Sequence, residues 1–575
     1  MKLDLIKGIS KISSFGVILF LCGLNLCVMH YGAYLSDVVD NIEFTTIIDN
    51  LFGVTIDVII LFMFAYFLTW KHVKLSLCIT FFITWCWSFS NLIYVRFFNH
   101  YITLSAVEEF SSLFDSQIAK CVLESLQLSD VIFIFSLFLF VLFVKNIQQI
   151  NSLINKLILI LILVIGIDAS AYILYCCHKP EYRYVSFLTS RYKHRQFSIN
   201  LHLCDFNYAS FSRGSIRSIL YDLYLVAYGN IIITDEQKEI IEKISYASMN
   251  SISSEEEKQT TTNLIFILVE SYMSFVSDMK VNGYEITPFL NSLKNDSTVY
   301  FNCMMNDNVT IGESSDGQFV YMTGILPLRS SITVSKAKNI ILPGLPKVIG
   351  YESRMIIPTA YSMWKQDEMC RQYGFDKLYG KDDYKGLYDT NLNDEQVFSL
   401  AMEKDYSSKQ PFFSIILTMS MHQPYTKQID STFLINDSTI SAELSCYLNA
   451  CHYTDKQIAK YFNHLKREGL YDNSLIVIAS DHSVHNTDFG GVCKQLPFYI
   501  INSHILPSEM WQGECNQLDV YTTLLDLFNC DSDWGGLGHS LTSPNYKNTV
   551  IKQTWDASEW IIMSDYFLKK EKNDN

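Results

Sequence analysis

Long apolar stretches fill the first third of this 575-residue chain, and they limit what its N-terminal part can fold into. A helix needs about 20 apolar residues to cross roughly 30 Å of hydrocarbon. Five stretches approach or meet that length: Ser14 to Leu35, Phe52 to Trp70, Val73 to Phe97, Asp130 to Lys145 and Leu157 to Cys177. The fourth is the shortest. The sequence therefore predicts a five-helix transmembrane domain over residues 1–178.

The positive charges around these spans indicate an orientation. Only Arg96 and Lys120 lie in the short loops on one side, whereas seven lysines lie on the other: Lys2, Lys7, Lys11, Lys71, Lys74, Lys145 and Lys156. Cytoplasmic loops carry the excess of lysine and arginine. We therefore expect a cytoplasmic N-terminus and, after five crossings, an extracytoplasmic remainder. A cleaved signal peptide is the alternative for the first span, but its lysines are dispersed and no small-residue cleavage site follows it.

The composition argues against some partners and some metal sites. The formal net charge of −15 argues against nucleic acid, because phosphate binding needs a basic surface. None of the fifteen cysteines forms a Cys-x-x-Cys pair, so we expect disulfides or buried thiols rather than a thiolate metal site. The cysteines that would face the oxidising side are Cys303, Cys370, Cys446, Cys451, Cys493, Cys515 and Cys530.

Residues 179–260 form a predicted connector near the membrane surface. Its first part carries a basic cluster among aromatic residues: Lys179, Arg183, Arg191, Lys193 and Arg195. Anionic lipid headgroups attract such a cluster, but charges scattered along a solvated linker explain it equally well. The polar segment SISSEEEKQTTT, from Ser251 to Thr262, ends the connector.

Residues 261–575 alternate short β-rich runs with helical segments. The strand candidates are Leu264 to Val269, Phe412 to Thr418, Ser474 to Ala479 and Phe498 to Ile501. Asp455 to Lys466 carries apolar side chains at helical spacing, and Gly469 follows as a stop signal. This pattern predicts an α/β domain with a mostly parallel sheet covered by helices on both faces.

Three of the predicted strands end in residues that can bind a metal or move a proton. Glu270 follows the first strand, His422 the second, and Asp481 with His482 the third. Ligands of an open α/β sheet gather at the carboxyl ends of its strands, so we expect these side chains at one edge. Considered alone, Glu270 fits the role of a helix cap about as well as that of a metal ligand. His422 alone fits an ordinary loop histidine about as well as a functional one. The adjacent Asp481 and His482 have little use in packing and are the stronger signal.

Ser314 lies in the segment GESSDGQ, whose pattern indicates a loop that opens into a helix. Amide groups at a helix N-terminus stabilise a bound phosphate or an alkoxide. Serine is a weak nucleophile at neutral pH unless a base or a metal activates it, and the strand-end ligands would supply that metal. The alternative is that Ser314, Ser315 and Asp316 only cap the helix.

Seven longer motifs extend through the second domain: NLIFILVES from Asn263, TPFLNSL from Thr287, GESSDGQFVYMTGILPL from Gly312, TMSMHQPY from Thr418, YLNACHYTDKQIAKYF from Tyr447, GLYDNSLIVIASDHS from Gly469 and YTTLLDLF from Tyr521. Together they resemble the lipoteichoic acid synthases and related phosphoglycerol transferases of the alkaline phosphatase and sulfatase superfamily. In the membrane part, NLIYVRFFNHYIT from Asn91 resembles the loop after the third span of that family. The resemblance thus extends over nearly the whole chain.

The resemblance implies a set of site residues and a cofactor. It makes Glu270, Ser314, Asp481 and His482 the ligands of one divalent ion, with Ser314 as the nucleophile and His422 as a substrate-binding or proton-transfer residue. Carboxylates with one imidazole and no thiolate suit Mn²⁺ or Zn²⁺ better than Mg²⁺, and the family favours Mn²⁺. Most members have threonine at the nucleophile position, so serine is a conservative departure.

A larger departure lies near Trp364. The synthases carry an arginine two residues after the corresponding tryptophan, where it holds glycerol phosphate, whereas this chain has Gln366. Trp364 is expected to bind substrate as a pocket wall, and a packed core aromatic is the alternative. The identity of the transferred headgroup therefore stays open.

These expectations combine into a metal-dependent phosphotransferase of a bacterial cytoplasmic (inner) membrane, with a role in cell envelope biogenesis. A phosphoglycerol or phosphoethanolamine group would pass from a phospholipid donor to a glycan or lipid acceptor on the extracytoplasmic (periplasmic) side. The group would be carried as a phosphodiester on Ser314.

Three other functions are alternatives. A sulfatase or related phosphodiester hydrolase shares the fold, but a sulfatase needs a Cys/Ser-x-Pro-x-Arg sequence, and the proline and arginine are missing after Ser314. An inactive membrane-anchored binding module would have lost part of the ligand set, whereas every expected ligand type is present. A transporter has little support, because we expect no charge pairs within the predicted spans.

Overall fold

The computed structural model describes most of the chain and divides it into two compact units. The described residues are 2–36, 38–39, 44–98, 100–104, 125–147, 206–228, 233–250, 262–329, 331–384, 391–484, 489, 492–530 and 532–568. Residues 1–107 and 118–229 belong to the first unit, and residues 108–117 and 230–575 belong to the second.

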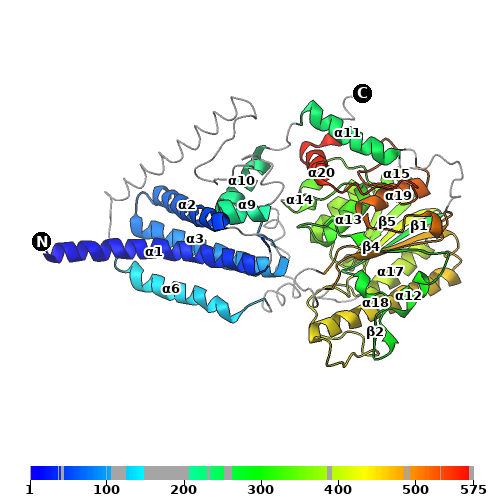
Figure 1. Ribbon diagram of the computed structural model, residues 1–575, viewed down its shortest axis with the longest axis horizontal. Helices are drawn as coiled ribbons and strands as arrows, with labels where there is room; N and C mark the ends of the chain where they lie inside the picture. Colours follow the sequence, from blue (N-terminus) through cyan, green and yellow to red (C-terminus); the bar gives the residue numbers. More distant parts are fainter. Residues whose placement is uncertain are drawn as a thin grey trace. The chain divides into compact units, whose positions relative to one another are not determined.

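The first unit is helical (Figure 1). Its described helices are α1 (Lys2–Leu35), α2 (Phe44–Leu68), α3 (Val73–Phe98), α6 (Val131–Val144), α9 (Phe206–Arg213) and α10 (Ser215–Tyr228), with a short η2 (Leu128–Asp130) before α6. Helix α6 stacks its Phe140 ring on Phe81 of α3, with the ring centroids 4.0 Å apart. Large apolar side chains such as Phe20 and Phe64 are exposed on the outside of the unit, as expected for helices surrounded by lipid.

Three helices within the described residues are long and apolar enough to cross a membrane, over Ser14–Leu35, Thr46–Leu68 and Val73–Arg96. They confirm the first three predicted spans. The predicted fourth span forms α6, whose 14 residues reach only about 21 Å and fall short of the hydrocarbon thickness. The fifth, Leu157 to Cys177, lies outside the described residues. Within the described residues, three of the five predicted spans are therefore present at full length, and the fourth is too short.

Charge pairs within the helices of the first unit also correct an expectation. The Asp57 carboxylate of α2 accepts from Arg217 Nε of α10 at 2.9 Å and from the Ile216 amide at 3.0 Å. Arg96 of α3 donates two hydrogen bonds of 2.8 Å to Asp130. Ionised groups in apolar surroundings are costly unless they are paired. Because each of these charges has a partner, the pairs fasten helices to one another.

The second unit is built around an eight-stranded sheet with the order β10-β4-β9-β8-β1-β7-β5-β6. The strands are β1 (Asn263–Val269), β4 (Tyr300–Asn306), β5 (Glu352–Ile356), β6 (Lys377–Tyr379), β7 (Phe412–Leu417), β8 (Ser474–Ser480), β9 (Leu496–Ile501) and β10 (Cys515–Asn516). Only β9 runs antiparallel to its neighbours. A separate hairpin joins β2 (Lys280–Val281) to β3 (Tyr284–Glu285).

All four predicted strands are present, as β1, β7, β8 and β9, and the sheet is mostly parallel as expected. Every residue of β1, β7 and β8 is buried. Such strands need cover on both faces, which explains why they appear in the sequence as continuous apolar runs.

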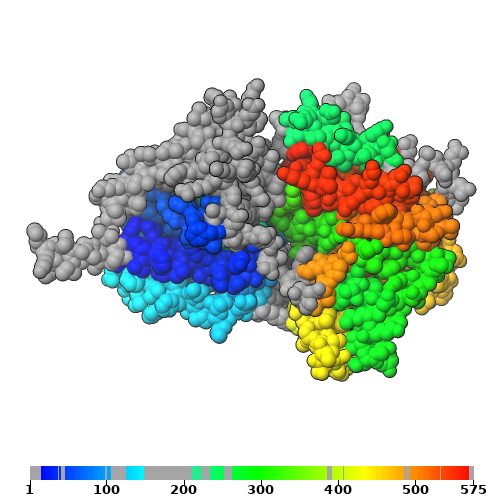
Figure 2. Space-filling view, in the orientation of Figure 1, coloured from blue at the N-terminus to red at the C-terminus, as the bar shows by residue number. Residues whose placement is uncertain are grey.

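Helices cover both faces of the sheet (Figure 1). One face carries α12 (Pro288–Lys294), α17 (Asp394–Tyr406) and α18 (Ala442–Arg467), and the other carries α13 (Ser314–Thr323), α14 (Thr333–Ala337), α15 (Leu345–Ile349), α19 (Leu518–Leu527) and α20 (Lys552–Ser564). Helix α11 (Asp235–Met249) packs beside α20, as the space-filling view shows (Figure 2). The remaining helical segments are α16 (Gln366–Tyr373), η3 (Ser274–Val276), η4 (Met363–Lys365), η5 (Lys381–Asp383) and η6 (Pro507–Glu509).

Helix α18 contains the predicted helix and begins 13 residues before it. Its N-terminus is set by Ser441, whose hydroxyl accepts from the Leu444 amide and satisfies one of the free amides of the first turn. Gly469 follows the helix with a φ of 71°, a conformation that glycine adopts without strain.

Candidate metal centre

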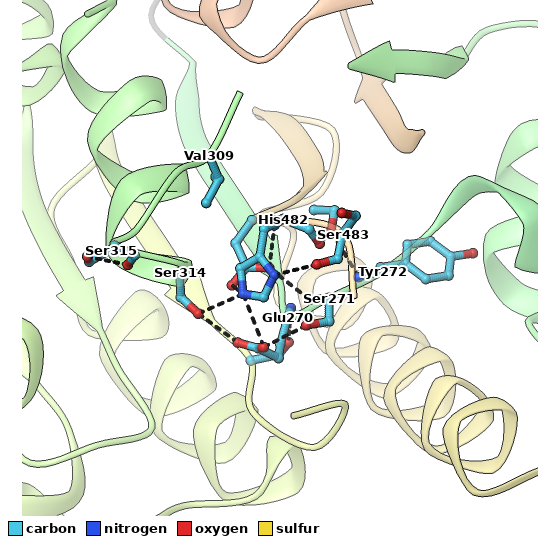
Figure 3. A network of polar contacts seen from close by, with 12 residues as sticks. Glu270, Ser271, Tyr272, Val309, Ser314, Ser315, His482 and Ser483 are labelled. Carbon is cyan, nitrogen blue, oxygen red and sulfur yellow. Dashed lines mark hydrogen bonds and ion pairs between the residues drawn. The ribbon is translucent and has the colours of Figure 1, made fainter. Parts of the chain in front are cut away.

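Glu270, Asp481 and His482 come together because of the register of two neighbouring strands. Strands β1 and β8 run parallel and pair Val269 with Ser480, so the next residue of each strand emerges at the same edge. The three side chains can each place one ligand atom within 4.8 Å of the others. His482 Nε2 lies 3.5 Å from Glu270 Oε1 and 3.6 Å from Asp481 Oδ2 (Figure 3).

Hydrogen bonds fix the direction of each of these side chains. Asp481 Oδ1 accepts from the amides of Ser271 and His482 at 2.8 and 2.7 Å, which leaves Oδ2 facing the cluster. His482 Nδ1 donates to the Ser483 carbonyl at 2.8 Å. In a neutral ring Nε2 then has its lone pair directed to the cluster, the usual arrangement of a metal-binding histidine.

The cluster carries more carboxylate charge than one imidazole neutralises. Glu270, Asp481 and His482 are only 5%, 3% and 6% exposed. Burial and the nearby Glu270 carboxylate raise the pKa of Asp481 well above its usual range. Burial alone would lower the pKa of His482, but Asp481 and Glu270 outweigh it and raise that pKa to about 10. Burial works against ionised Glu270, yet His482 and His422 bring its pKa below the ordinary value. The raised pKa values of Asp481 and His482 both mean that this cluster favours binding of a proton or another cation.

Two carboxylates and one imidazole within a few ångströms are a suitable ligand set for a divalent metal. The buried position and the inward-facing Nε2 of His482 fit such an ion, since its charge would compensate the two carboxylates. The geometry therefore indicates a divalent metal centre at the carboxyl ends of β1 and β8.

Ser314 joins this cluster from the first position of α13. Its hydroxyl donates to Glu270 Oε2 at 3.1 Å, and its Oγ lies 3.2 Å from His482 Nε2 (Figure 3). The structure thus brings four predicted site residues together, from three separate segments of the chain.

The close approach of α13 depends on residues that the sequence did not single out for this role. Gly317 faces the Asp481 carbonyl, and a Cβ at this position would lie 2.2 Å from that oxygen. The Asp316 carboxylate accepts from the Gly312 amide and from the Thr310 hydroxyl at 2.8 Å, which holds the loop before Ser314. Burial raises the pKa of Asp316 to about 6. These contacts place the Ser314 hydroxyl at the cluster.

Gln517 and Tyr321 support the other side of the site. Gln517 Nε2 donates to the Asp481 carbonyl at 2.7 Å, and the Tyr321 hydroxyl donates to the Ser480 carbonyl at 2.7 Å. Neither residue follows a predicted strand, and Gln517 is 36 positions from Asp481. Local sequence patterns contain no signal for such a contact.

His422 lies at the same sheet edge but makes no hydrogen bond to the triad among the described contacts. It follows β7, which pairs Leu417 with Leu268 of β1 just before Glu270. Its side chain is exposed, and its Nδ1 donates to the Gln423 carbonyl at 2.5 Å, so Nε2 is available to a substrate. Its effect on the pKa of Glu270 shows that it is near enough to act electrostatically.

Trp364 is half-buried in η4, and among the described residues no hydrogen bond or ring contact joins it to the triad. Trp364 and Lys365 both have positive φ, at 49° and 54°, a strained conformation for residues other than glycine. Gln366 follows and donates to Gln318 of α13 at 3.2 Å. The segment therefore packs against the helix that begins at Ser314.

The cysteines of the second unit are free thiols, so the structure gives no support to the expected disulfides. Cys370, Cys446, Cys451 and Cys515 are buried, which agrees with the other expectation, inert core thiols. No cysteine belongs to the metal cluster found among the described residues.

Comparison with known proteins identifies this domain. Residues 262–530 match the family model described as Sulfatase. They form a sulfatase-like domain. Lipoteichoic acid synthase 2 of Bacillus subtilis (strain 168) is 29% identical over 318 residues, which are 50% of this chain and 48% of that protein. Lipoteichoic acid synthase 1 of the same organism is 28% identical over 408 residues, 63% of each chain. The matched part is thus less than two thirds of the length of either relative.

A solved structure extends the likeness beyond the sulfatase domain. The integral membrane protein lipooligosaccharide phosphoethanolamine transferase A from Neisseria meningitidis matches 92% of this chain and 97% of its own, with a TM-score of 0.52 and 12% identity. At this identity the match concerns the fold: apolar N-terminal helices followed by a sulfatase domain.

Proposed function

We propose that the chain is a membrane-anchored phosphotransferase that moves a phospho-alcohol headgroup from a phospholipid to a glycan or lipid hydroxyl. The observation that carries the proposal is the position of Ser314 Oγ, 3.1 Å from Glu270 and 3.2 Å from His482 of a buried triad. A hydroxyl that only capped α13 would have no reason to contact a metal-binding cluster. The names of the relatives, two lipoteichoic acid synthases, support the same reaction class.

The site would hold one divalent ion through Glu270, Asp481, His482 and Ser314. When bound, the ion would lower the pKa of the Ser314 hydroxyl and polarise a phosphoryl oxygen. We propose Mn²⁺, with Zn²⁺ and Mg²⁺ as the alternatives, because the ligand set contains carboxylate and imidazole but no thiolate.

In the first step Ser314 Oγ attacks the phosphorus of the donor lipid. Its proton is directed at Glu270 Oε2, the nearest acceptor. The Oγ–P bond forms, the bond from phosphorus to the diacylglycerol oxygen breaks, and diacylglycerol leaves after taking up a proton. The positive end of the α13 dipole, at whose first position Ser314 lies, would stabilise the charge of the phosphate.

In the second step His422 Nε2 accepts the proton of an acceptor hydroxyl. That oxygen attacks the seryl phosphodiester, the Oγ–P bond breaks, and Ser314 regains a proton. His422 suits this role because its Nδ1 is held by Gln423 while its exposed Nε2 can meet a second substrate.

The transferred group is phosphoglycerol or phosphoethanolamine. Trp364 is proposed as a wall of the headgroup pocket, because its strained segment packs on the helix that carries Ser314. The amide of Gln366 is neutral and does not by itself select a charged headgroup.

The proposed topology follows the lysine distribution. The N-terminus would lie in the cytoplasm, residues 1–178 in a bacterial cytoplasmic membrane, residues 179–260 along its outer surface, and residues 261–575 outside. The metal centre would then have access to phospholipid headgroups of the outer leaflet.

Donor release tests the proposal directly. Purified full-length protein is incubated with Mn²⁺ and either labelled phosphatidylglycerol or labelled phosphatidylethanolamine, and diacylglycerol is measured. We expect release from one of the two lipids and a headgroup attached to the Ser314 peptide in mass spectrometry. A Ser314→Ala variant that folds, inserts and still releases diacylglycerol at a near-normal rate would falsify the nucleophile assignment.

A further inference from the structure

The membrane part of the chain contains a buried ion pair at an unusual depth. Asp57 of α2 is the middle residue of the apolar span Thr46–Leu68, about 16 Å from either end. Its carboxylate is fully buried and accepts from Arg217 Nε of α10 at 2.9 Å. The Ile216 amide donates to the same carboxylate at 3.0 Å, so the backbone of α10 approaches Asp57 as closely as the arginine does. If Thr46–Leu68 crosses the bilayer, the first turn of α10 therefore lies near the middle of the hydrocarbon.

Two further contacts give the start of α10 the same depth. Trp87 Nε1 of α3 donates to Ser215 Oγ at 2.9 Å, and Trp87 lies only about 4 Å from the middle of the span Val73–Arg96. Gly214, which joins α9 to α10, has a φ of 109°, and a Cβ there would lie 2.4 Å from Asp57 Oδ2. The residue at this junction must therefore be small and able to adopt a positive φ, as glycine is. The bend between α9 and α10 thus meets the middle of two separate spans.

Helix α9 leads to this bend from one end of the helix bundle. The Tyr101 amide, which follows the end of α3, donates to the Asn207 side chain near the start of α9 at 3.0 Å. Four residues further along α9, the Phe211 carbonyl accepts from Asn50 Nδ2 at 2.7 Å. Asn50 precedes Asp57 in α2 by seven residues, or about 10 Å. Successive residues of α9 thus contact points that lie progressively deeper, from the end of α3 to the centre of α2.

The length of α10 suits a return to the membrane surface. The helix has 14 residues, too few to cross roughly 30 Å of hydrocarbon. From Arg217 to Tyr228 it rises about 16 Å, or about half of that thickness. The positive φ of Gly214 prevents α9 and α10 from forming one continuous helix, and the two helices meet at an angle beside α2 (Figure 1). These dimensions fit one arm that descends to the middle of the bilayer and a second arm that returns.

The two faces of α10 have the reverse of the polarity that is usual in water. Ser215 and Ser218 are 1% and 4% exposed, whereas Leu220 and Leu223 are 50% and 53% exposed. A helix at the surface of a soluble protein turns its apolar side chains to the core. The two leucines are three positions apart, so they share one side of the helix, and they are exposed as Phe64 of the span in α2 is. Such a side fits acyl chains as its surroundings.

We propose that residues 206–228 form a re-entrant helix pair, which enters the bilayer beside α2, turns at Gly214 and presents Leu220 and Leu223 to lipid acyl chains. Arg217 holds the bend at this depth through Asp57, because an ionised group in hydrocarbon needs a partner. Both ends of the pair lie where α1 ends and α2 begins, which is the outer side in the proposed topology. Part of the connector is then inserted into the outer leaflet and does not lie along its surface. The insertion does not depend on which group the protein transfers.

Photo-crosslinking tests the contact with acyl chains. In the full-length protein, p-benzoylphenylalanine replaces one residue at a time, and each variant is placed in nanodiscs of phosphatidylglycerol and phosphatidylethanolamine. The positions are Leu220 and Leu223, with Phe64 as the positive control and Tyr246 of the second unit, 66% exposed, as the negative control. We expect mass spectrometry to find acyl-chain adducts at Leu220, Leu223 and Phe64 but not at Tyr246. Headgroup adducts alone, or no lipid adduct, at both leucines would overturn the proposal.

A second measurement tests whether the pair returns to the side from which it enters. In separate variants p-azidophenylalanine replaces Ser36, which follows α1, or Tyr228, which ends α10. A membrane-impermeant cyclooctyne is added to spheroplasts before or after permeabilisation. We expect both positions to react under the same condition. Reaction under opposite conditions would show that α9 and α10 cross the bilayer, and it would overturn the re-entrant arrangement.

The ion pair gives a third test. With Asp57→Leu we expect acyl-chain adducts at Leu223 to fall roughly tenfold and headgroup adducts to replace them, because Arg217 without its partner leaves the hydrocarbon. Asp57→Leu combined with Arg217→Leu should restore the acyl-chain adducts, since no charge then remains buried. Unchanged adducts in the single variant would overturn the role of the pair. Failure of the proposed function appears separately, as absent diacylglycerol release by the unmutated protein.

Discussion

Two buried ionic clusters of the second unit differ in their charge balance. At the carboxyl ends of β1 and β8, Glu270 and Asp481 share one imidazole. Away from that cluster, Arg354 of β5 pairs with Asp405 at 3.7 Å, and the Tyr461 hydroxyl donates to the same carboxylate. Arg354 also donates to the Lys404 carbonyl at 2.6 Å.

The difference separates a structural cluster from a functional one. In the Arg354–Asp405 cluster one cation meets one anion, and the Phe412 ring lies 4.6 Å from the guanidinium. A buried pair of this kind is compensated internally, and removing one partner leaves an uncompensated charge. The Glu270–Asp481–His482 cluster has two carboxylates to one imidazole, which favours binding of a proton or a metal ion. We therefore expect mutations to change stability in the first cluster and metal binding or activity in the second.

The largest expected effect is that of Asp481→Asn. Asparagine keeps the acceptor for the Ser271 and His482 amides but removes a charged ligand. We expect diacylglycerol release to fall on the order of 10³-fold or more and bound metal to fall well below one ion per chain. In metal-free protein the variant should be at least as stable as the unmutated chain, because carboxylate repulsion is relieved. Turnover and metal content are measured together, and a clearly less stable metal-free variant would contradict the comparison.

Arg354→Met should have the opposite profile. It leaves Asp405 buried without its cation, so we expect a loss of about 3–5 kcal/mol in the free energy of unfolding. Metal content at saturating Mn²⁺ should stay at one ion per chain. Denaturant unfolding of the full chain in detergent measures the stability, and Arg354→Met with Asp405→Leu should recover part of the loss. A drop in metal affinity without a loss of stability would show that the two clusters are not independent.

The three residues of the candidate metal centre were easier to predict from the sequence than the strands and contacts around them. Glu270, Asp481 and His482 were found because each directly follows a run of apolar residues that can only be a buried strand. Strand β4 was missed because polar Asn302 and Asn306 interrupt the apolar pattern, and only Tyr300, Asn302 and Met305 of the strand are buried.

The contacts that hold the centre in place come from remote parts of the chain. Gln517 supports the Asp481 carbonyl, and Asp394 holds the turn before His422, yet neither position carries a local signal. Their roles exist only after the sheet and its covering helices have formed. Gly317 is a partial exception, because a glycine inside a helix indicates a close approach without naming the partner.

Metal removal should have the next largest effect, and it should distinguish the two clusters. At a metal concentration 100 times the Kd, binding to the folded state alone contributes about 2.7 kcal/mol. We expect EDTA to remove this stabilisation from the unmutated protein and from Arg354→Met, and Mn²⁺ to restore it. Asp481→Asn should be insensitive to both additions. Thermal unfolding with and without EDTA measures the shift, and an equal shift in Asp481→Asn would place the metal elsewhere.

Gly317→Ala tests whether Ser314 is positioned separately from the triad. The added Cβ would meet the Asp481 carbonyl at 2.2 Å, so α13 must move away from β8. A displacement of about 1 Å costs roughly 10²-fold in rate, while the triad should still bind its ion. Gly16→Ala is a control, since no heavy atom lies within 4 Å of the Cβ position there. Unchanged turnover in Gly317→Ala would mean that the position of α13 does not limit the reaction.

The smallest effects come from two tyrosines, one at each cluster. Tyr461→Phe removes a hydrogen bond to the Asp405 carboxylate and should cost about 1.5 kcal/mol of stability without affecting turnover. Tyr447 donates to the Ser271 carbonyl at 2.9 Å, and its oxygen accepts from the Met273 amide at 3.2 Å, directly after Glu270. Tyr447→Phe should therefore cost about 1 kcal/mol and also lower turnover, because the backbone that directs Glu270 loses a contact. The two variants carry the same substitution at different clusters. A difference between them in unfolding free energy or in turnover therefore reflects which cluster has lost the hydroxyl. Equal turnover in the two variants would mean that the contacts after Glu270 serve stability alone.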